Sequence, residues 1–277
     1  MEDKRTHELP ELYAPNGGEG PYSYSQNSNY QRGVVEAAKE KINEAIANHF
    51  DIKTFCGSKN PVCMVDLGCS TGANTFITVQ NIVEAIKLKY KSKGVNAQIP
   101  DFLVFFNDNV SHDFNTLFRS LPPNRQYFAA GVPGSFHDCL FPKESLHLIH
   151  SSCALNWLSN YRIKGLVEEA KVDSFNVPAY YIPRKKLMAL IERNGNFSIK
   201  KMEVLNNQKK HHILQSASLR SLYLRAVLEG IIEKHFGNEI LDELFNRFTH
   251  KVEGSSFFLN PETDKLIILF VLLERNN

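Results

Sequence analysis

Residues 62–75 constrain the fold of this chain more than any other stretch. Four apolar residues precede Asp66, and two glycines four positions apart, Gly68 and Gly72, follow before a helical pattern begins. This order predicts a buried strand, a tight loop and a helix N-terminus, which together hold a nucleotide-like ligand at the carboxyl end of a parallel strand. The glycines permit backbone conformations that are closed to other residues and let a ligand approach the main chain.

Apolar patterns along the rest of the chain alternate between those of strands and those of helices. Further strands are expected at 101–108, 126–133, 146–152, 197–205 and 265–274. Helices are expected at 32–49, 75–90, 111–121, 185–193, 219–236 and 238–252. Continuous hydrophobicity in 101–108 is typical of a strand covered on both faces. We therefore expect an α/β fold with a doubly wound, mainly parallel sheet.

Composition and charge exclude several classes of protein. The chain has 277 residues, 43% of them hydrophobic, which suits one large α/β domain or a domain with a cap. A net charge of +2 gives no reason to expect nucleic acid or an anionic membrane as a partner. The five cysteines form no CxxC pair, and the longest apolar run, 266–273, is far shorter than the roughly 20 residues of a membrane span. A cytoplasmic protein with reduced thiols is expected.

The first 31 residues differ in composition from the rest of the chain. They are rich in Gly, Ser, Asn and Tyr, which is typical either of a flexible leader or of a segment that folds over a site. We divide the chain into this N-terminal segment, 1–31, and a ligand-binding domain, 32–277. Residual cap elements are expected around 160–195 and 206–256.

Two acids follow the first two strands of the predicted sheet. Asp66 ends the first strand, and Asp108 ends the second, where nucleotide-binding folds place an acid that binds the ribose diol. Each alone is also typical of a turn or a helix cap. The loop lacks the G-x-G-x-x-G fingerprint, so the pair favours an adenosyl ligand without a pyrophosphate over a dinucleotide.

Other catalytic chemistries find no support in the sequence. His147 and His150 lie three apart on a predicted strand and point to opposite faces, so they cannot bind one zinc ion directly; core or hydrogen-bonded histidines are expected. The chain has no Walker loop and no recognisable nucleophile–histidine signature.

Five motifs occur in order along nearly the whole chain. They are 23–28 with Gln31, then 66–75, 106–108, 131–136 and 150–159. In these the chain resembles the plant SABATH methyltransferases, which methylate carboxylic acids such as salicylate, benzoate, jasmonate, indole acetate or farnesoate, and xanthine nitrogens in the caffeine branch. The resemblance implies a class I methyltransferase fold and a methyl transfer from S-adenosylmethionine to a small-molecule carboxylic acid. It also implies catalysis by positioning, with no catalytic acid or base.

The resemblance implies roles for individual residues. The cofactor site would be formed by Tyr24, Ser28, Asp66, Cys69, Asn74, Asp108, Ser135 and Phe136. The acceptor carboxylate would be held by Gln31 and Trp157, with Cys153 and Asn156 beside them in place of a Tyr and of a Met, His or Gln. Asp173, Phe175 and Asn176 match positions sometimes given to a magnesium site, for which a structural loop is the alternative. A homodimer is also expected from the family.

The chain departs from the family most clearly after Trp157. Between Leu158 and Asp173 we find no apolar strand, although the family places cap elements and the fifth strand of the sheet there. A crossover between parallel strands needs a dozen or more residues, so this interval is too short for all of these elements. We expect a shortened chain that lacks the fifth strand and has an open substrate pocket. Two alternatives stay open: an inactive relative that binds the cofactor or a sister subunit, and an N-methyltransferase of the xanthine type.

Overall fold

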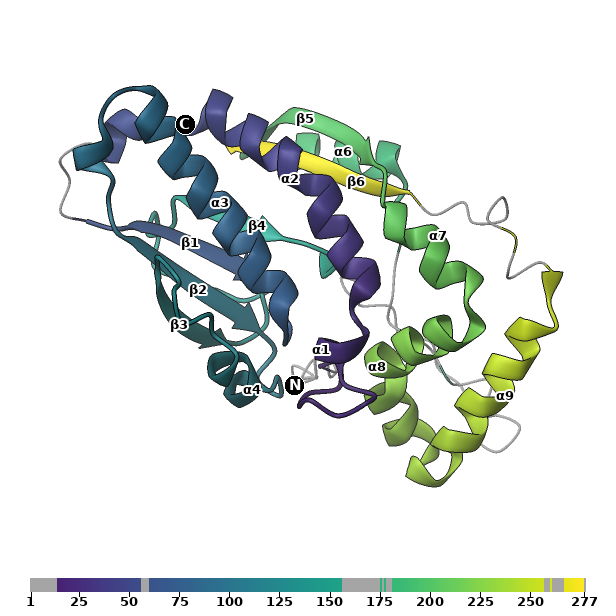
Figure 1. Cartoon of the computed structure of the whole chain (residues 1–277). Helices are drawn as coiled ribbons and strands as arrows, with labels where there is room; N and C mark the ends of the chain where they lie inside the picture. The colour runs from purple at the N-terminus through teal and green to yellow at the C-terminus, as the bar shows by residue number, and fades with distance from the viewer. Residues whose placement is uncertain are drawn as a thin grey trace, which may run out of the picture.

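A four-stranded parallel sheet forms the centre of the computed structural model (Figure 1). The structure describes residues 14–55, 60–155, 181–256 and 267–276, with the single residues 175, 177 and 260. The strand order is β3-β2-β1-β4. The strands are β1 (Val62–Leu67), β2 (Phe102–Asp108), β3 (Phe128–Pro133) and β4 (Leu148–Ser151). The predicted α/β fold with a mainly parallel sheet is confirmed.

The register of the strands brings their carboxyl ends to one edge of the sheet. Asp66 of β1 lies opposite Phe106 of β2 and His150 of β4. Asp108, at the end of β2, lies opposite Pro133 of β3. Loops that leave these strands therefore start close together, as expected for a ligand site in an open α/β sheet.

Two long helices pack against one face of this sheet and against each other (Figure 1). They are α2 (Asn29–His49) and α3 (Ala73–Ser92). Apolar residues of α3 recur at helical spacing, so Val79, Val83 and Ile86 are all fully buried against the strands. The predicted helices 32–49 and 75–90 are thus confirmed, each starting a few residues earlier than expected.

The helix predicted over 111–121 is shorter in the structure. It is α4 (Phe114–Arg119), and the Asp113 carboxylate caps its start by accepting a hydrogen bond from the Thr116 N–H. Before it, the Asn109 side chain accepts from the backbone N–H of Ser111 at 3.0 Å. This side-chain turn competes with helix formation, which explains why the helix begins later than its apolar pattern indicates.

The two remaining strands form a second sheet. The strands β5 (Phe197–Leu205) and β6 (Ile268–Arg275) pair antiparallel with each other, with an irregularity between Ile199 and Lys201. Within the described residues, no strand lies between β4 and β5 that would join the two sheets. The interval for which the sequence predicts no fifth strand, 158–173, lies outside the described residues, so that expectation stays a prediction.

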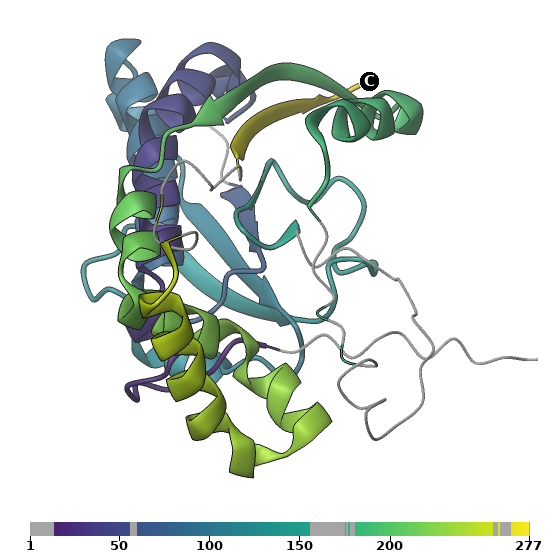
Figure 2. The same ribbon diagram turned by 90° about the vertical axis from the view of Figure 1, so that its right-hand side faces the viewer.

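The C-terminal half is mostly helical (Figure 2). Its helices are α6 (Arg184–Asn194), α7 (Gln208–Gln215), α8 (Ala217–Phe236) and α9 (Leu241–Glu253). Single 3₁₀ turns occupy η1 (Ile52–Phe55), η2 (Asn96–Gln98) and η4 (Asn238–Ile240). The apolar pattern does not predict helix α7, because its polar run gives no apolar stripe; its start is fixed instead by the Asn207 side chain, which accepts from the Lys209 N–H. No helix among the described residues has the length and apolar composition to cross a membrane.

Residues 14–28 connect the sheet to the helical half. The backbone N–H of Asn16 donates to the Ala226 carbonyl of α8 at 2.9 Å, and its side chain donates to Glu229 at 3.0 Å. The Gly18 N–H donates to the Asp113 carboxylate at 2.9 Å. The short helix α1 (Tyr24–Asn27) follows and contacts α8. This segment therefore lies between the loop after β2 and α8, although the division of the chain into domains stays a prediction.

Ile86 and Leu88 offer a matched test of this packing. Ile86 is fully buried in the main core, while Leu88, on the same helix, is 59% exposed. We expect Ile86→Ala to lower the free energy of unfolding by about 2–5 kcal/mol, because it leaves a cavity between α3 and the sheet. Leu88→Ala should change it by about 0.5 kcal/mol or less. Urea denaturation followed by circular dichroism measures both, and equal losses would contradict the packing of α3.

Candidate functional site

The loop between β1 and α3 has an unusual backbone that the rest of the site is built on. Gly68 and Gly72 adopt φ angles of 73° and 104°, and Ser70 between them has φ 51°. A Cβ on Gly68 would lie 2.3 Å from the Cβ of Ala154, so only glycine fits there. The left-handed conformation of Ser70 is strained for a residue with a side chain, and such strain is concentrated at ligand sites.

Hydrogen bonds from β2 hold this loop in place. The backbone N–H groups of Gly68 and Cys69 donate to the Asn107 carbonyl at 2.9 and 3.0 Å. The Ser70 N–H donates to the Asp108 carboxylate at 2.8 Å. The second oxygen of that carboxylate accepts from the Asn109 N–H at 2.8 Å. Asp108 thus fixes the loop and still has free lone pairs for a ligand.

Asn107 extends the same support to the loop after β3. Its buried side-chain amide donates to the carbonyls of Val132 and Gly134 at 2.8 and 2.9 Å. Ser135 and Phe136 follow directly, and Phe136 comes within 3.9 Å of the place where a Cβ of Gly68 would lie. The ends of β1, β2 and β3 therefore converge, and they bring four predicted cofactor residues, Cys69, Asp108, Ser135 and Phe136, to one edge of the sheet.

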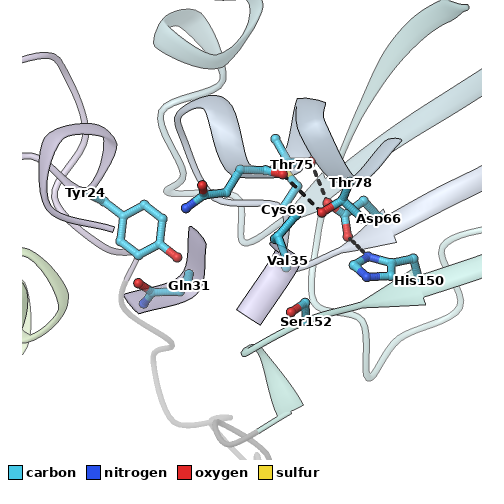
Figure 3. Close-up of a pocket in the computed structure, with 11 residues that line it drawn as sticks. Tyr24, Gln31, Val35, Asp66, Cys69, Thr75, Thr78, His150 and Ser152 are labelled. Atoms are coloured by element: carbon cyan, nitrogen blue, oxygen red, sulfur yellow. Dashed lines mark hydrogen bonds and ion pairs between the residues drawn. The ribbon is translucent and has the colours of Figure 1, made fainter. Parts of the chain in front are cut away.

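The Asp66 carboxylate lies almost entirely buried at the end of β1. One oxygen accepts a hydrogen bond of 2.5 Å from the Thr75 hydroxyl, and the other lies 2.7 Å from Nδ1 of His150 (Figure 3). The three side chains come from β1, α3 and β4, so this network joins the strand to the elements on either side. A buried carboxylate is costly unless it is hydrogen-bonded, and both oxygens here are.

A pocket opens between this network and the N-terminal helices. The open space between its lining residues, solvent at the mouth included, amounts to about 320 Å³. In Figure 3, Tyr24 and Gln31 lie on one side of it and Asp66 and His150 on the other. Five of the predicted site residues line it, namely Tyr24, Gln31, Asp66, Cys69 and Asn74.

Ser28 and Asn74, both predicted to bind the cofactor, lie next to each other. The Asn74 amide donates to the carbonyl and the hydroxyl of Ser28 at 3.0 and 2.9 Å. Its carbonyl oxygen accepts from Nε of Arg32 at 2.7 Å. These bonds tie the start of α3 to the start of α2, and of the two residues Asn74 lines the pocket.

Two side chains that line the pocket, Cys69 and Tyr24, are held in their neutral forms. Burial raises the pKa of the Cys69 thiol well above its usual range, and the nearby Asp108 and Asp66 raise it further. Burial also raises the pKa of Tyr24, with smaller contributions from Cys153 and Tyr223. Near neutral pH both groups therefore keep their protons, and Cys69 cannot act as a thiolate nucleophile.

Several predicted substrate and metal residues are not placed in this pocket. Asn156, Trp157, Asp173 and Asn176 lie outside the described residues. Cys153 is exposed two residues after β4, with a φ of 58°. The ring of Phe175 packs against Phe236 at 5.0 Å between centroids.

Sequence reasoning missed part of the site. Pocket residues that the sequence does not predict are Val35, Thr75, Thr78, His150 and Ser152. The expectation that His147 and His150 are hydrogen-bonded is confirmed, since Nδ1 of His147 accepts from the Cys63 N–H at 2.9 Å and His150 pairs with Asp66. The pairing with Asp66 depends on the register between β1 and β4, which no local pattern reveals.

Comparison with known proteins agrees with this geometry. A family model described as SAM dependent carboxyl methyltransferase matches residues 10–164 and 162–276. The solved structure of a loganic acid methyltransferase with SAH superimposes with a TM-score of 0.87 at 34% identity, covering 95% of this chain and 99% of that one. The parallel sheet and this match define an S-adenosylmethionine-dependent methyltransferase.

Two relatives show to which family of methyltransferases the chain belongs. Loganic acid O-methyltransferase of Catharanthus roseus is 34% identical over 355 positions, covering 96% of this chain and 95% of its own. Farnesoic acid carboxyl-O-methyltransferase of Arabidopsis thaliana is 52% identical, but over 52% of this chain and 40% of its own. Within its class the chain belongs to the SABATH family of plant carboxyl methyltransferases.

The comparisons also locate the missing segment. The 355 aligned positions exceed the 277 residues of the chain, so part of the relative has no counterpart here. The two parts of the family match meet at residues 162–164, inside the interval 158–173 in which the sequence shows no apolar strand pattern. The chain is thus a shortened member of its family.

Thr75 and Thr78 of α3 test the buried network. Thr75→Val removes a hydrogen bond to the Asp66 carboxylate, and we expect it to lower the free energy of unfolding by about 1.5–3 kcal/mol. Thr78→Val removes only a bond to the Asn74 carbonyl one turn earlier, and about 1 kcal/mol or less is expected. Thermal unfolding of both variants measures the difference. A loss at Thr75 no larger than at Thr78 would contradict the structural role of Asp66.

Proposed function

We propose that this protein transfers a methyl group from S-adenosylmethionine to the carboxylate of a small-molecule plant acid, giving a methyl ester. The observation that carries the proposal is the pocket between the Gly68–Gly72 loop and Gln31, which offers hydrogen-bond donors in place of a nucleophile. The relatives of this protein include enzymes named for loganic acid and farnesoic acid, both of which are carboxylic acids.

The residues around the loop suit a polar, uncharged ligand such as an adenosine group. Buried polar atoms without a partner lie in and beside the loop, namely Oγ of Ser70 and Oδ1 of Asn107. Such atoms are rare in native proteins and mark places where a bound molecule completes the hydrogen bonds. Asp108 is the proposed acceptor for the ribose hydroxyls. The other proposed cofactor residues are Tyr24, Ser28, Asp66, Cys69, Asn74, Ser135 and Phe136.

Methyl transfer to a carboxylate needs little chemistry from the protein. Free carboxylic acids titrate near pH 4, so the acceptor is already ionised and no general base is required. The bound cofactor supplies an activated methyl group on its sulfonium. The protein has to hold one carboxylate oxygen in line with that group and keep water out. In this proposal the Gln31 amide and the indole N–H of Trp157 hold the carboxylate, with Cys153 and Asn156 beside it.

The magnesium site and the homodimer enter no step of this mechanism. The proposed ligands are Asp173, Phe175 and Asn176, and the one described residue among them packs its ring against His235 and Phe236. That contact is the packing expected of a structural loop.

A second candidate is an inactive relative that still binds cofactor. The missing segment favours it, because a family member of full length places cap elements over the substrate there. The loop that would bind the cofactor is intact in this chain, so binding and turnover are separable. An N-methyltransferase acting on xanthines is a third candidate, since caffeine synthase 1 of Camellia taliensis is 27% identical over 97% of this chain.

One assay separates these candidates. The purified chain is incubated with methyl-labelled S-adenosylmethionine and a panel containing loganic, farnesoic, salicylic and jasmonic acids together with xanthines. Base-labile labelled product from an acid supports the proposed function, and base-stable product from a xanthine supports the third candidate. Calorimetric binding of the cofactor without turnover of any acceptor would establish the inactive relative instead.

A substitution of Gln31, which the structure describes, tests how the acid is recognised. We expect Gln31→Met, which keeps the length of the side chain but removes its amide, to raise the KM for the acid roughly 10–100-fold, the loss of a hydrogen bond to a charged group. The Kd for the cofactor should change by about twofold or less. The matched control is Gln26→Met on the exposed side of α1, which should leave both constants unchanged. A normal KM in Gln31→Met would contradict the assignment.

A further inference from the structure

Three potential metal ligands meet at the carboxyl ends of β1 and β2. The Sγ of Cys69, a carboxylate oxygen of Asp108 and a ring nitrogen of His112 all lie within 4.8 Å of one another. They come from three different backbone segments: the glycine loop, the end of β2 and the turn before α4. Zinc bonds of about 2.0–2.3 Å hold ligand atoms within about 4 Å of each other, so small side-chain rotations would close the cluster on an ion.

A second observation at His112, separate from the distances in the cluster, points to a bound ligand. Its side chain is only 6% exposed, and neither ring nitrogen has a hydrogen-bond partner. The ring contacts Phe114 edge-on at 4.9 Å between centroids, a contact that uses neither nitrogen. Buried imidazole nitrogens are normally paired, so one of them is available for a ligand between Cys69 and Asp108.

The charges around the cluster suit a cation. Asp108 faces both Cys69 and His112, Asp66 faces Cys69 from the end of β1, and Asp113 faces His112 from the start of α4. On the outer side of this cluster, Asp113 also faces the positive charge of Arg119.

We propose that Cys69, Asp108 and His112 form a Zn²⁺ site in the cofactor-free protein, and that zinc and cofactor exclude each other. Zinc accepts a thiolate, an imidazole and a carboxylate, whereas magnesium prefers oxygen ligands and disfavours the first two; the fourth position is left to water. On binding, the Cys69 thiol loses its proton to solvent as the sulfur–zinc bond forms. Zinc affinity therefore rises with pH and each binding event releases one proton from Cys69.

The exclusion rests on the proposed function. Cys69 and Asp108 belong to the proposed cofactor site, and an ion bound between them occupies the place where the cofactor's polar groups would approach the glycine loop. Zinc should then act as a competitor of S-adenosylmethionine and not of the acid. Zinc bound at the Gly68–Gly72 loop would then inhibit the enzyme by keeping S-adenosylmethionine from binding.

Calorimetric titration of the cofactor-free chain with zinc chloride tests the site. The background variant Cys139→Ser removes an exposed thiol near His137 that would bind zinc independently. We expect one strong site, with a binding enthalpy that changes with the ionisation enthalpy of the buffer. His112→Gln should weaken it at least 100-fold, while the same substitution at the exposed His250 should leave it unchanged. Equal affinity in the His112 and His250 variants would overturn the site.

Cobalt provides a readout that a purely structural role would not produce. Co²⁺ bound through Cys69 should give a thiolate-to-cobalt charge-transfer absorption, and Cys69→Ser should abolish it in a chain that still shows the circular dichroism spectrum of the parent. A band that persists in Cys69→Ser would overturn the assignment of the thiol. If Cys69→Ser loses the circular dichroism spectrum of the parent, the zinc titration of His112→Gln tests the site instead, because that variant leaves Cys69 unaltered.

Competition between metal and cofactor tests the exclusion. In the parent chain the apparent Kd for S-adenosylmethionine should rise in proportion to free zinc, and in His112→Gln it should stay constant. Independent binding of both ligands to the parent would overturn the exclusion. A chain that binds zinc but no cofactor at any zinc concentration would contradict the proposed function, while the zinc titration would still support the metal site.

Discussion

The buried carboxylate of Asp66 is the interaction on which the site depends. It ends β1, and its two oxygens are satisfied by Thr75 of α3 and His150 of β4. Because an unpaired buried charge is costly, these partners fix where the helix starts and how the edge strand is aligned. The strained loop between Gly68 and Gly72 is then held from the other side by Asn107 and Asp108. The ligand site is thus rigid before any ligand binds, which lowers the entropic cost of binding.

A second charged centre fixes the N-terminal segment over this edge. The Arg225 side chain of α8 is largely buried, pairs with Glu229 and Asp242, and stacks on the Tyr22 ring at 3.6 Å. Its two acid partners raise the pKa of Arg225, so its charge is permanent. The same Glu229 accepts from Asn16. Since α8 and α9 are held by this arginine as well, the position of Tyr24 beside the pocket depends on the packing of the helical half.

The sequence predicts the features that depend on residues close together in the chain, and it misses those that depend on residues far apart. Strand β1 and helix α3 follow from local apolar patterns and from Gly68 and Gly72, whose conformations only glycine adopts easily. The sequence predicts Asp66 as a ligand residue, but its pairing with His150 arises from strand register across 84 positions. Asn107 and His112 give no signal of their own, because their roles come from loops that meet only after folding. The helix α7 follows from a cap at Asn207 rather than from periodicity.

The outer strands of the parallel sheet are more exposed than the inner strand β1. A doubly wound sheet carries helices on both faces, and β1 is buried accordingly. Yet Ile149 of β4 is 57% exposed and Phe128 of β3 is 63% exposed, in strands whose apolar sequence suits burial. Among the described residues, α2, α3 and α4 pack on one face, whereas Phe105 on the other meets Phe141 of a loop. The two parts of the family match meet at residues 162–164, and the alignment with the loganic acid enzyme contains positions that have no counterpart in this chain. The backbone N–H groups of the Gly68–Gly72 loop donate to Asn107 and Asp108 of β2, so these hydrogen bonds do not depend on the interval after β4.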